Sequence, residues 1–394
     1  MRGVPATVWR LTAAYILMMA GTPMMVLLAG IIGTDIAPSP GLATLPIALV
    51  VVGVAASTLP TGRLLDRFGR RPVFLTYGLI AIAGALLAMH GLNRGSFTVF
   101  CLAAMVMGWT GAAGHQYRFA ALESVPIEQA PKATSFLLLG GVFSAFIGPE
   151  LAVRGRVLLE TEYAGSFLLL IGSYVAGLAL IAGYRDDGFH HAAPGGEGRT
   201  LVEIFRSPVI RIAVLAAALG YGVMSFIMTA TPISMHVHAG HSLDATKFVI
   251  QSHIAAMYLP ALVFPWLFAR FGWRRMLWAG MAIYAGCLFI GLFDQSFMHY
   301  WVALVLLGVG WNFLFLSGTN LLPAGYRPEE RFRVQAANDF LVFSVQAAVS
   351  LSAGWLLHLW QWQGIIALCY LPLFACALLL LRYREQKNDF VKFR

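Results

Sequence analysis

Four ionisable residues lie in stretches that are otherwise apolar, and these are the residues that could do chemistry. His115 and Arg118 are three positions apart in GHQYRFAALES, so they share one face of a helix. Asp339 lies about two turns into RVQAANDFLVFSVQ, and Glu150 follows a Gly-Pro pair in GGVFSAFIGPEL. Because charges are costly inside a bilayer, all four are candidates for ion coupling or substrate binding.

Each candidate also has a structural explanation. His115 and Arg118 could anchor the end of a helix by extending to water, and Glu150 could be an outward-facing rim residue. Asp339 lies too deep to cap a helix, but it could be a satisfied structural carboxylate. Asp339 is our first choice for proton coupling.

A group of histidines suggests a metal site, but its pattern does not match one. His236, His238 and His241 fall in an expected external loop, and His253 lies in the next apolar run. No carboxylate or cysteine stands at a spacing that would close a zinc site. We therefore expect solvated or gating histidines, no metal and no cofactor. Gln251 and His253 are better candidates for lining a cavity.

The elements that must position these residues are membrane helices. Of the 394 residues, 59% are hydrophobic and only 11% are charged, whereas a soluble domain carries about 25% charged residues. The four cysteines lie singly inside apolar runs, which argues against a disulfide framework. The first apolar run, Leu11 to Gly33, is longer than a signal-peptide core, so we expect it to be a retained span.

Hydropathy and chain breakers predict twelve membrane-spanning helices. Their expected ranges are 10–33, 42–62, 72–91, 97–118, 132–153, 164–183, 209–233, 246–269, 274–293, 299–321, 332–357 and 363–382.

Lysine and arginine are distributed unevenly around these helices. If both termini lie on one side, that side holds all 27 of these residues except Arg94, Arg154, Arg156 and Lys247. The positive-inside rule then places both termini in the cytoplasm, in a bacterial inner membrane. The net charge is +9, but the basic residues flank apolar runs and form no single stripe, which argues against nucleic-acid binding.

The chain divides near its middle. The polar stretch 185–208 is a predicted cytoplasmic linker between two six-helix bundles, residues 1–184 and 209–394. TGRLLDRFGRRPV in the first half has a weaker counterpart, PWLFARFGWRRML, in the second, and both contain RFG. A repeat of this length is typical of duplicated transporter bundles.

The ordered charges of GRLLDRFGRRPV (62–73), which we call the gate motif, carry a resemblance. The segment resembles the signature G-x-L-a-D-r-x-G-r-k of the major facilitator superfamily, at the position where that family carries it. The matching residues are Gly62, Asp66, Arg67, Gly69, Arg70 and Arg71. The twelve spans extend the resemblance to the whole chain. It implies an all-α integral membrane protein of two pseudo-symmetric bundles that works by alternating access.

The resemblance also implies how the gate motif works. Asp66 would meet the positive N-terminal end of the helix at 332–357, near Arg331 and Arg333, and latch the two halves. Gly62 would allow close helix packing and Gly69 a tight turn.

The arginines of the gate motif could pair with Glu123. In the second copy Ala269 replaces the aspartate, so we expect a weaker clasp there.

By the same resemblance, the helices at 10–33, 97–118, 209–233 and 299–321 line a central cavity. Together with the two residues from 246–269, the expected lining is Tyr15, Met18, Met19, Trp109, Tyr221, Met224, Met228, Gln251, His253, Trp311, Asn312, Phe315 and Asn320. Any one of these could instead serve helix packing. A wall rich in methionine and aromatic rings suits a flat, partly apolar organic solute better than a sugar or a bare ion.

These observations predict a monomeric secondary transporter and not an enzyme. No P-loop is present, so we expect an ion gradient, with protons as the ion, to drive transport. The segments HQYRFAALESVP, GGVFSAFIGPEL, TATPISMHVHAGHS and VIQSH are similar to a bacterial branch that includes riboflavin importers, magnetosome-membrane members and siderophore carriers. We expect uptake of a flavin-like or siderophore-like molecule.

Three alternatives stay open at this point. A drug-exporting proton antiporter of the family would carry an arginine in the middle of the helix at 97–118, where this chain has AAMVMGWTG, and a glycine pair after Gly-Pro, which is missing. A non-transporting scaffold or sensor would have little need of an intact gate motif. A membrane-embedded enzyme has no nucleophile–base pair at a plausible depth.

Overall fold

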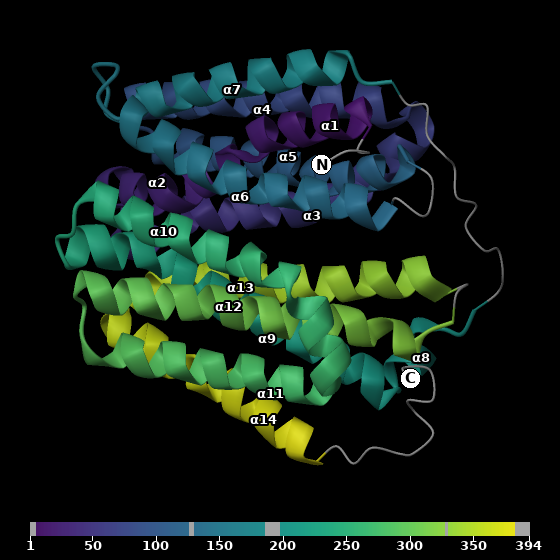
Figure 1. The fold of residues 1–394 in the computed structure, drawn as a ribbon. Helices are drawn as coiled ribbons and strands as arrows, with labels where there is room; N and C mark the ends of the chain where they lie inside the picture. Colours follow the sequence, from purple (N-terminus) through teal and green to yellow (C-terminus); the bar gives the residue numbers. More distant parts are fainter. Residues whose placement is uncertain (1–4, 126–129, 186–197, 328–329, 383–394) are drawn as a thin grey trace.

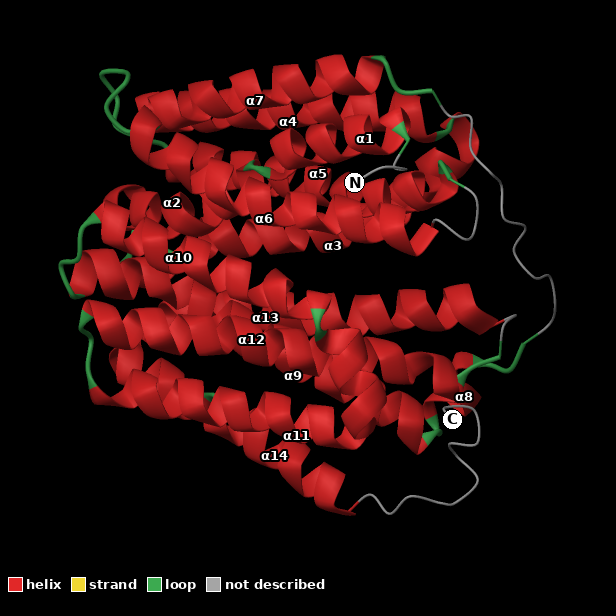
Figure 2. Cartoon of the chain, in the orientation of Figure 1, coloured by secondary structure: helices red, strands yellow, loops and turns green. Residues whose placement is uncertain are grey.

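The computed structural model describes residues 5–125, 130–185, 198–327 and 330–382, and within them the chain is helical, with no strand (Figure 2). The side chains of Asp66, Glu123 and Arg331 lie outside this description. The predicted latch at Asp66 and the predicted pairing with Glu123 therefore fall outside the described residues.

The helices fall into two groups that lie on opposite sides of the molecule (Figure 1). The first group consists of α1 (Ala6–Met19), α2 (Gly21–Ile36), α3 (Leu45–Phe68), α4 (Arg70–Asn93), α5 (Phe97–Glu123), α6 (Ala130–Gly155) and α7 (Ala164–Ala182). The second consists of α8 (Leu201–Phe205), α9 (Pro208–Pro232), α10 (Leu243–Tyr258), α11 (Phe264–Phe293), α12 (Phe297–Leu321), α13 (Arg331–Leu368) and α14 (Tyr370–Arg382). Short helical turns extend them: η1 (Pro40–Leu42), η3 (Ile233–His238), η4 (Leu259–Leu262) and η5 (Leu322–Gly325).

The twelve predicted spans correspond to these helices. Nine segments of the described chain are long and apolar enough to cross a membrane. The last of them, Arg333–Arg382, contains two predicted spans separated by a non-helical residue, Gln361. Of the two remaining predicted spans, 132–153 corresponds to α6, and 246–269 covers α10, η4 and the first residues of α11. The predicted all-α membrane fold is thus confirmed.

The two copies of RFG share one backbone conformation. Gly69 ends α3 with φ 77° and ψ 173°, and Gly272 interrupts α11 with φ 76° and ψ 164°. A positive φ of this kind favours glycine, which has no Cβ. Gly62 behaves differently, because a Cβ there would meet no atom of the described residues within 4 Å. Among these residues the predicted close helix packing at Gly62 is not found.

The two groups of helices are joined near one end, the end that carries residues 37–44, 156–163 and 239–242, which we call the closed end. There α13 packs on α3 and η1, α10 packs on α6, and α2 packs on α9 and η3. The opposite, arginine-rich end carries residues 63–71, the start of α1 and the end of α14, and there the ribbons of α3 and α13 are separated (Figure 1).

Gly354 tests this packing because it lies where α13 crosses η1. A Cβ there would clash with the Thr44 hydroxyl and lie 2.9 Å from the carbonyl oxygen of Gly41. We expect Gly354→Ala to destabilise the protein by about 1–3 kcal/mol, measured by thermal unfolding in detergent. The control is Gly172→Ala in α7, where a Cβ meets no atom of the described part of the chain within 4 Å. Equal midpoints for the two variants would contradict this packing.

Candidate functional site

Five aromatic residues from four helices of the second group form what we call the aromatic cluster: Tyr221, Tyr258, Trp311, Phe315 and Phe343. The ring of Tyr221 lies 5.2 Å from Trp311, 5.1 Å from Phe315 and 5.8 Å from Phe343. Trp311 and Phe315 are stacked, with ring centroids 5.0 Å apart and planes 16° apart. Tyr258 lies 6.2 Å from Trp311. The cluster therefore brings aromatic rings from four helices into contact with one another.

Residues of the first group face this cluster from α1 and α5. The His115 ring lies 5.9 Å from Phe343. Arg118, one turn further along α5, interacts electrostatically with His115, Tyr15 and Asp339. Arg118 therefore couples electrostatically to both of the other ionisable candidates predicted on α5 and α13.

Two polar groups are available inside this site. The Trp311 side chain is 4% exposed, and its indole N–H has no hydrogen-bond partner among the described residues. The Asp339 carboxylate accepts a hydrogen bond from the amide of Asn338 at 3.1 Å. Since an unsatisfied buried donor costs free energy, the Trp311 N–H is a natural partner for an acceptor on a bound molecule.

Other predicted lining residues lie elsewhere. His253 and Asn312 are each 1% exposed and join α10 to α12. His253 Nδ1 is 2.8 Å from the carbonyl oxygen of Leu304, and the Asn312 amide donates to the carbonyl of Met257 at 2.7 Å. Both residues therefore stabilise the packing of α10 against α12.

Four further predicted residues also lie outside the aromatic cluster. Asn320 donates to the carbonyl of Leu316 in its own helix, and Met19 packs against Gly114. Met228 is buried, whereas Trp109 is 42% exposed.

Glu150 belongs to the closed end. Its carboxylate lies 2.9 Å from Lys247 on α10 and 3.2 Å from Arg154 on its own helix. Lys247 also contacts Asp244 at 3.0 Å. One turn along α10, Gln251 donates to the carbonyl of Phe146 at 3.1 Å. These contacts link α6 to α10, so Glu150 and Gln251 tie the two groups of helices together.

The histidines near the closed end order a loop. His236 Nδ1 lies 2.7 Å from the carbonyl oxygen of His241, whose Nε2 lies 2.8 Å from that of Gln295. No group of three or more histidine, cysteine or acidic residues in the described part of the chain could hold a metal ion.

The gate-motif arginines that the structure describes bind backbone groups and rings. Arg71 donates to the carbonyl of Ala182 at 2.6 Å, and Arg70 lies 3.5 Å from that of Gln116. Arg67 lies over the Phe68 ring at 5.1 Å.

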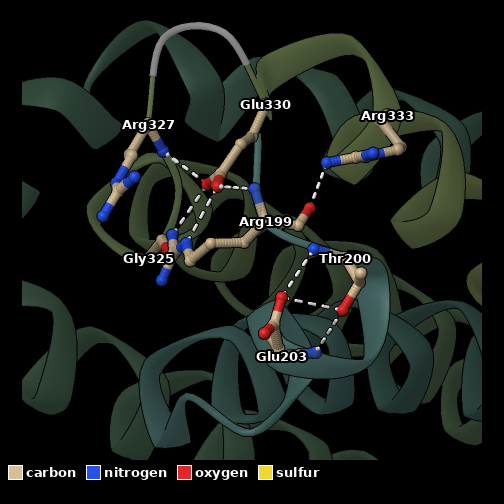
Figure 3. A network of polar contacts seen from close by, with 7 residues as sticks. All are labelled: Arg199, Thr200, Glu203, Gly325, Arg327, Glu330 and Arg333. Atoms are coloured by element: carbon tan, nitrogen blue, oxygen red, sulfur yellow. Dashed lines mark hydrogen bonds and ion pairs between the residues drawn. The ribbon is translucent and has the colours of Figure 1, made fainter. Parts of the chain in front are cut away.

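An ion pair at the arginine-rich end was not predicted (Figure 3). Arg199 donates to both oxygens of Glu330, from Nε at 2.8 Å and from Nη2 at 2.7 Å. The backbone N–H groups of Arg199 and Arg327 each add a hydrogen bond of 2.9 Å to the same carboxylate, whose side chain is 0% exposed. These contacts fasten the segment before α8 to the turn between α12 and α13. Hydrogen bonds from Arg199 lower the pKa of the Glu330 carboxyl from 4.5 to about 2.

A capping box continues this network. Thr200 and Glu203 hydrogen-bond reciprocally at the start of α8, and Arg333 donates to the carbonyl of Arg199 (Figure 3). The pattern T-x-x-E at 200–203 was the available sequence signal for this helix start. Nothing in the sequence indicated that the arginine before it would reach Glu330.

Sequence comparison connects this arrangement to known proteins. A family model described as "Major Facilitator Superfamily" matches residues 11–349. The riboflavin transporter RfnT of Brucella anthropi is 34% identical over 373 residues, covering 92% of this chain and 94% of that protein. The uncharacterized MFS-type transporter YdeG of Bacillus subtilis is 30% identical, covering 90% of this chain and 87% of that protein.

Among solved structures, the fold resembles that of a bacterial homolog of the human lysosomal transporter Spinster, in an inward-facing and unoccupied conformation. The TM-score is 0.70 at 14% identity, and the match covers 95% of this chain and 96% of that one. At this identity the likeness shows the fold alone.

The link between Glu150 and Lys247 can be measured by a double-mutant cycle. We expect Glu150→Gln and Lys247→Gln to show a coupling energy of about 1 kcal/mol in thermal unfolding, because the lysine is largely buried. The control cycle uses Arg156 and Glu162, an exposed pair at the same end within one loop. A coupling energy no larger than that of the control would contradict a link between the helix groups.

The ion pair of Glu330 should make the stability of the protein depend on pH. Because its pKa is lowered on folding, its stabilising effect is present above about pH 4.5 and is lost as the pH falls toward 2. We expect Glu330→Gln to lower the unfolding midpoint at pH 7 by a few degrees and the difference from wild type to shrink below pH 4.5. Glu203→Gln, which removes an exposed carboxylate from the neighbouring capping box, should have a smaller effect. A pH-independent difference would refute the assignment.

Proposed function

The chain belongs to the Major Facilitator Superfamily, and from this membership we propose that it moves a flat, partly apolar solute of the flavin class. It is a multi-pass membrane transporter and not an enzyme. The observation that carries the proposal is the aromatic cluster, in which Trp311 and Phe315 stack and Tyr221 lies across both. Such faces suit a fused planar ring.

The polar groups around the cluster suit the same solute. The indole N–H of Trp311 can donate to a ring carbonyl, and His115 and Arg118 on α5 supply further hydrogen-bonding groups. The riboflavin transporter among the relatives supports this substrate class. Of the two solute classes predicted from the sequence, the rings favour the flavin over the siderophore.

Coupling to protons is proposed to run through Asp339. Its carboxylate on α13 interacts electrostatically with Arg118 on α5, so the interaction acts between the two groups of helices near the site. When Asp339 is ionised, this attraction favours the approach of α5 and α13. A proton on Asp339 removes the attraction, and protonation would therefore favour a different arrangement of the two groups.

In alternating access, the closed end would open while the arginine-rich end closes. We propose that residues 1–184 and 209–394 move against each other, and that Glu150–Lys247 and the contact at Gly354 part when the closed end opens. With the arginine-rich end in the cytoplasm of a bacterial inner membrane, as the positive-inside rule indicates, the arrangement described here receives or releases solute on the cytoplasmic side.

Transport assays in proteoliposomes test this proposal. We expect wild-type protein to accumulate labelled riboflavin when a proton gradient is imposed. Asp339→Asn should lose gradient-driven accumulation by at least about tenfold but retain exchange of labelled for unlabelled riboflavin, because the binding rings are intact. Glu160→Gln, which changes an exposed carboxylate in the loop after α6, is the matched control.

Two results would count against the proposal. If riboflavin does not move under any gradient and lipophilic cations do, the protein is a drug-type exporter. If Asp339→Asn accumulates riboflavin as wild type does, proton coupling runs through another group.

A further inference from the structure

A polar cavity lies at the arginine-rich end of the first group of helices. It has a volume of about 560 Å³ and is lined by Arg10 of α1, Arg71 of α4, and Ala182, Gly183 and Arg185 at the end of α7. In Figure 1 these ends of α4 and α7 lie on the side of the first group that faces away from the second. The cavity is therefore separate from the aromatic cluster.

Two of the arginines have a structural task. The last carbonyl groups of a helix have no partner within the helix and carry the negative end of its dipole. Arg71 donates to the carbonyl of Ala182 at 2.6 Å, and Arg10 donates to that of Gly183. These contacts hold both guanidinium groups at the cavity, but a carbonyl contributes no net negative charge.

The cavity therefore gathers three positive charges. Among the described residues, Arg10, Arg71 and Arg185 form no ion pair with a carboxylate. Three guanidinium groups around one space repel each other unless an anion lies between them. A guanidinium presents paired N–H groups that match two oxygens of a phosphate.

We propose that this cavity binds a phosphate-bearing anion, and that the anion is the head group of an anionic phospholipid. The helices beside it continue as apolar surface: exposed Leu79 on α4 lies about two turns from Arg71, and exposed Val175 on α7 about three turns from Arg185. An acyl chain could lie along this surface while the phosphate occupies the cavity. The position also agrees with the anionic cytoplasmic leaflet, which attracts each basic residue by about 1 kcal/mol.

Native mass spectrometry of the detergent-purified full chain tests the site, with short-chain phosphatidylglycerol and phosphatidylcholine as probes. We expect wild type to retain one phosphatidylglycerol in preference to phosphatidylcholine. The triple variant Arg10→Gln, Arg71→Gln, Arg185→Gln should bind it at least about tenfold more weakly. The matched control removes the same charge from the second group through Arg206→Gln, Arg211→Gln and Arg270→Gln, and should bind as wild type does.

A single substitution tests the site with less risk of misfolding than the triple variant. Arg185→Gln alone disturbs neither carbonyl contact, and we expect it to weaken binding severalfold. Equal retention of phosphatidylglycerol by the wild type, the triple variant and the control would overturn the site.

Competing occupants give distinct results. If inorganic phosphate binds as tightly as the lipid and displaces it, the phosphate site stands but its ligand is soluble, which overturns the lipid assignment. Asp186 and Asp187 follow Arg185 in the sequence and lie outside the described residues. If phosphatidylglycerol binds only to the variant Asp186→Asn, Asp187→Asn, the chain's own carboxylates fill the cavity and the proposal fails.

Discussion

The bilayer requires every backbone N–H and C=O group to find its partner inside the protein, and the rest of this structure depends on that constraint. It makes the spans helical. At the helix ends, where backbone groups have no partner within the helix, side chains must form the hydrogen bonds. Arg10 and Arg71 do so at the end of α7, and the N–H groups of Arg199 and Arg327 find the carboxylate of Glu330. Charged residues at the ends of spans thus bind unpaired backbone groups, in addition to setting the orientation of the chain in the membrane.

The same constraint explains where polar groups remain between the helices. His253 and Asn312 bind carbonyl groups of a neighbouring helix and are buried by that contact. Asp339 and Arg118, in contrast, come from different groups of helices and interact electrostatically near the aromatic cluster. A charge pair at a boundary that must open and close is suited to coupling, whereas a polar residue within one group is suited to packing.

The sequence predicted the twelve spans because apolar length is a local property, and it predicted the repeat because RFG needs the same glycine turn at residues 69 and 272. The sequence could not predict which side chains pair with one another across long separations. Glu330 lies 131 residues from Arg199, and no local pattern joins them. His253 and Asn312 were expected at a cavity because polarity in a span is visible in sequence, but the direction in which a side chain points is set by neighbouring helices. Gly62 was expected at a close helix contact for a similar local reason, but no atom of the described residues lies within 4 Å of a Cβ placed there.

The most direct test of the account is the affinity for riboflavin, measured from the quenching of its fluorescence on contact with aromatic rings. Stacking on one aromatic side chain is worth about 1–3 kcal/mol, so Trp311→Leu should weaken binding by about 5- to 150-fold. Trp266→Leu, which changes an exposed residue of α11, should bind as wild type does. Saturable quenching that is equal in both variants, or no saturable quenching in wild type, would contradict a flavin site at the aromatic cluster.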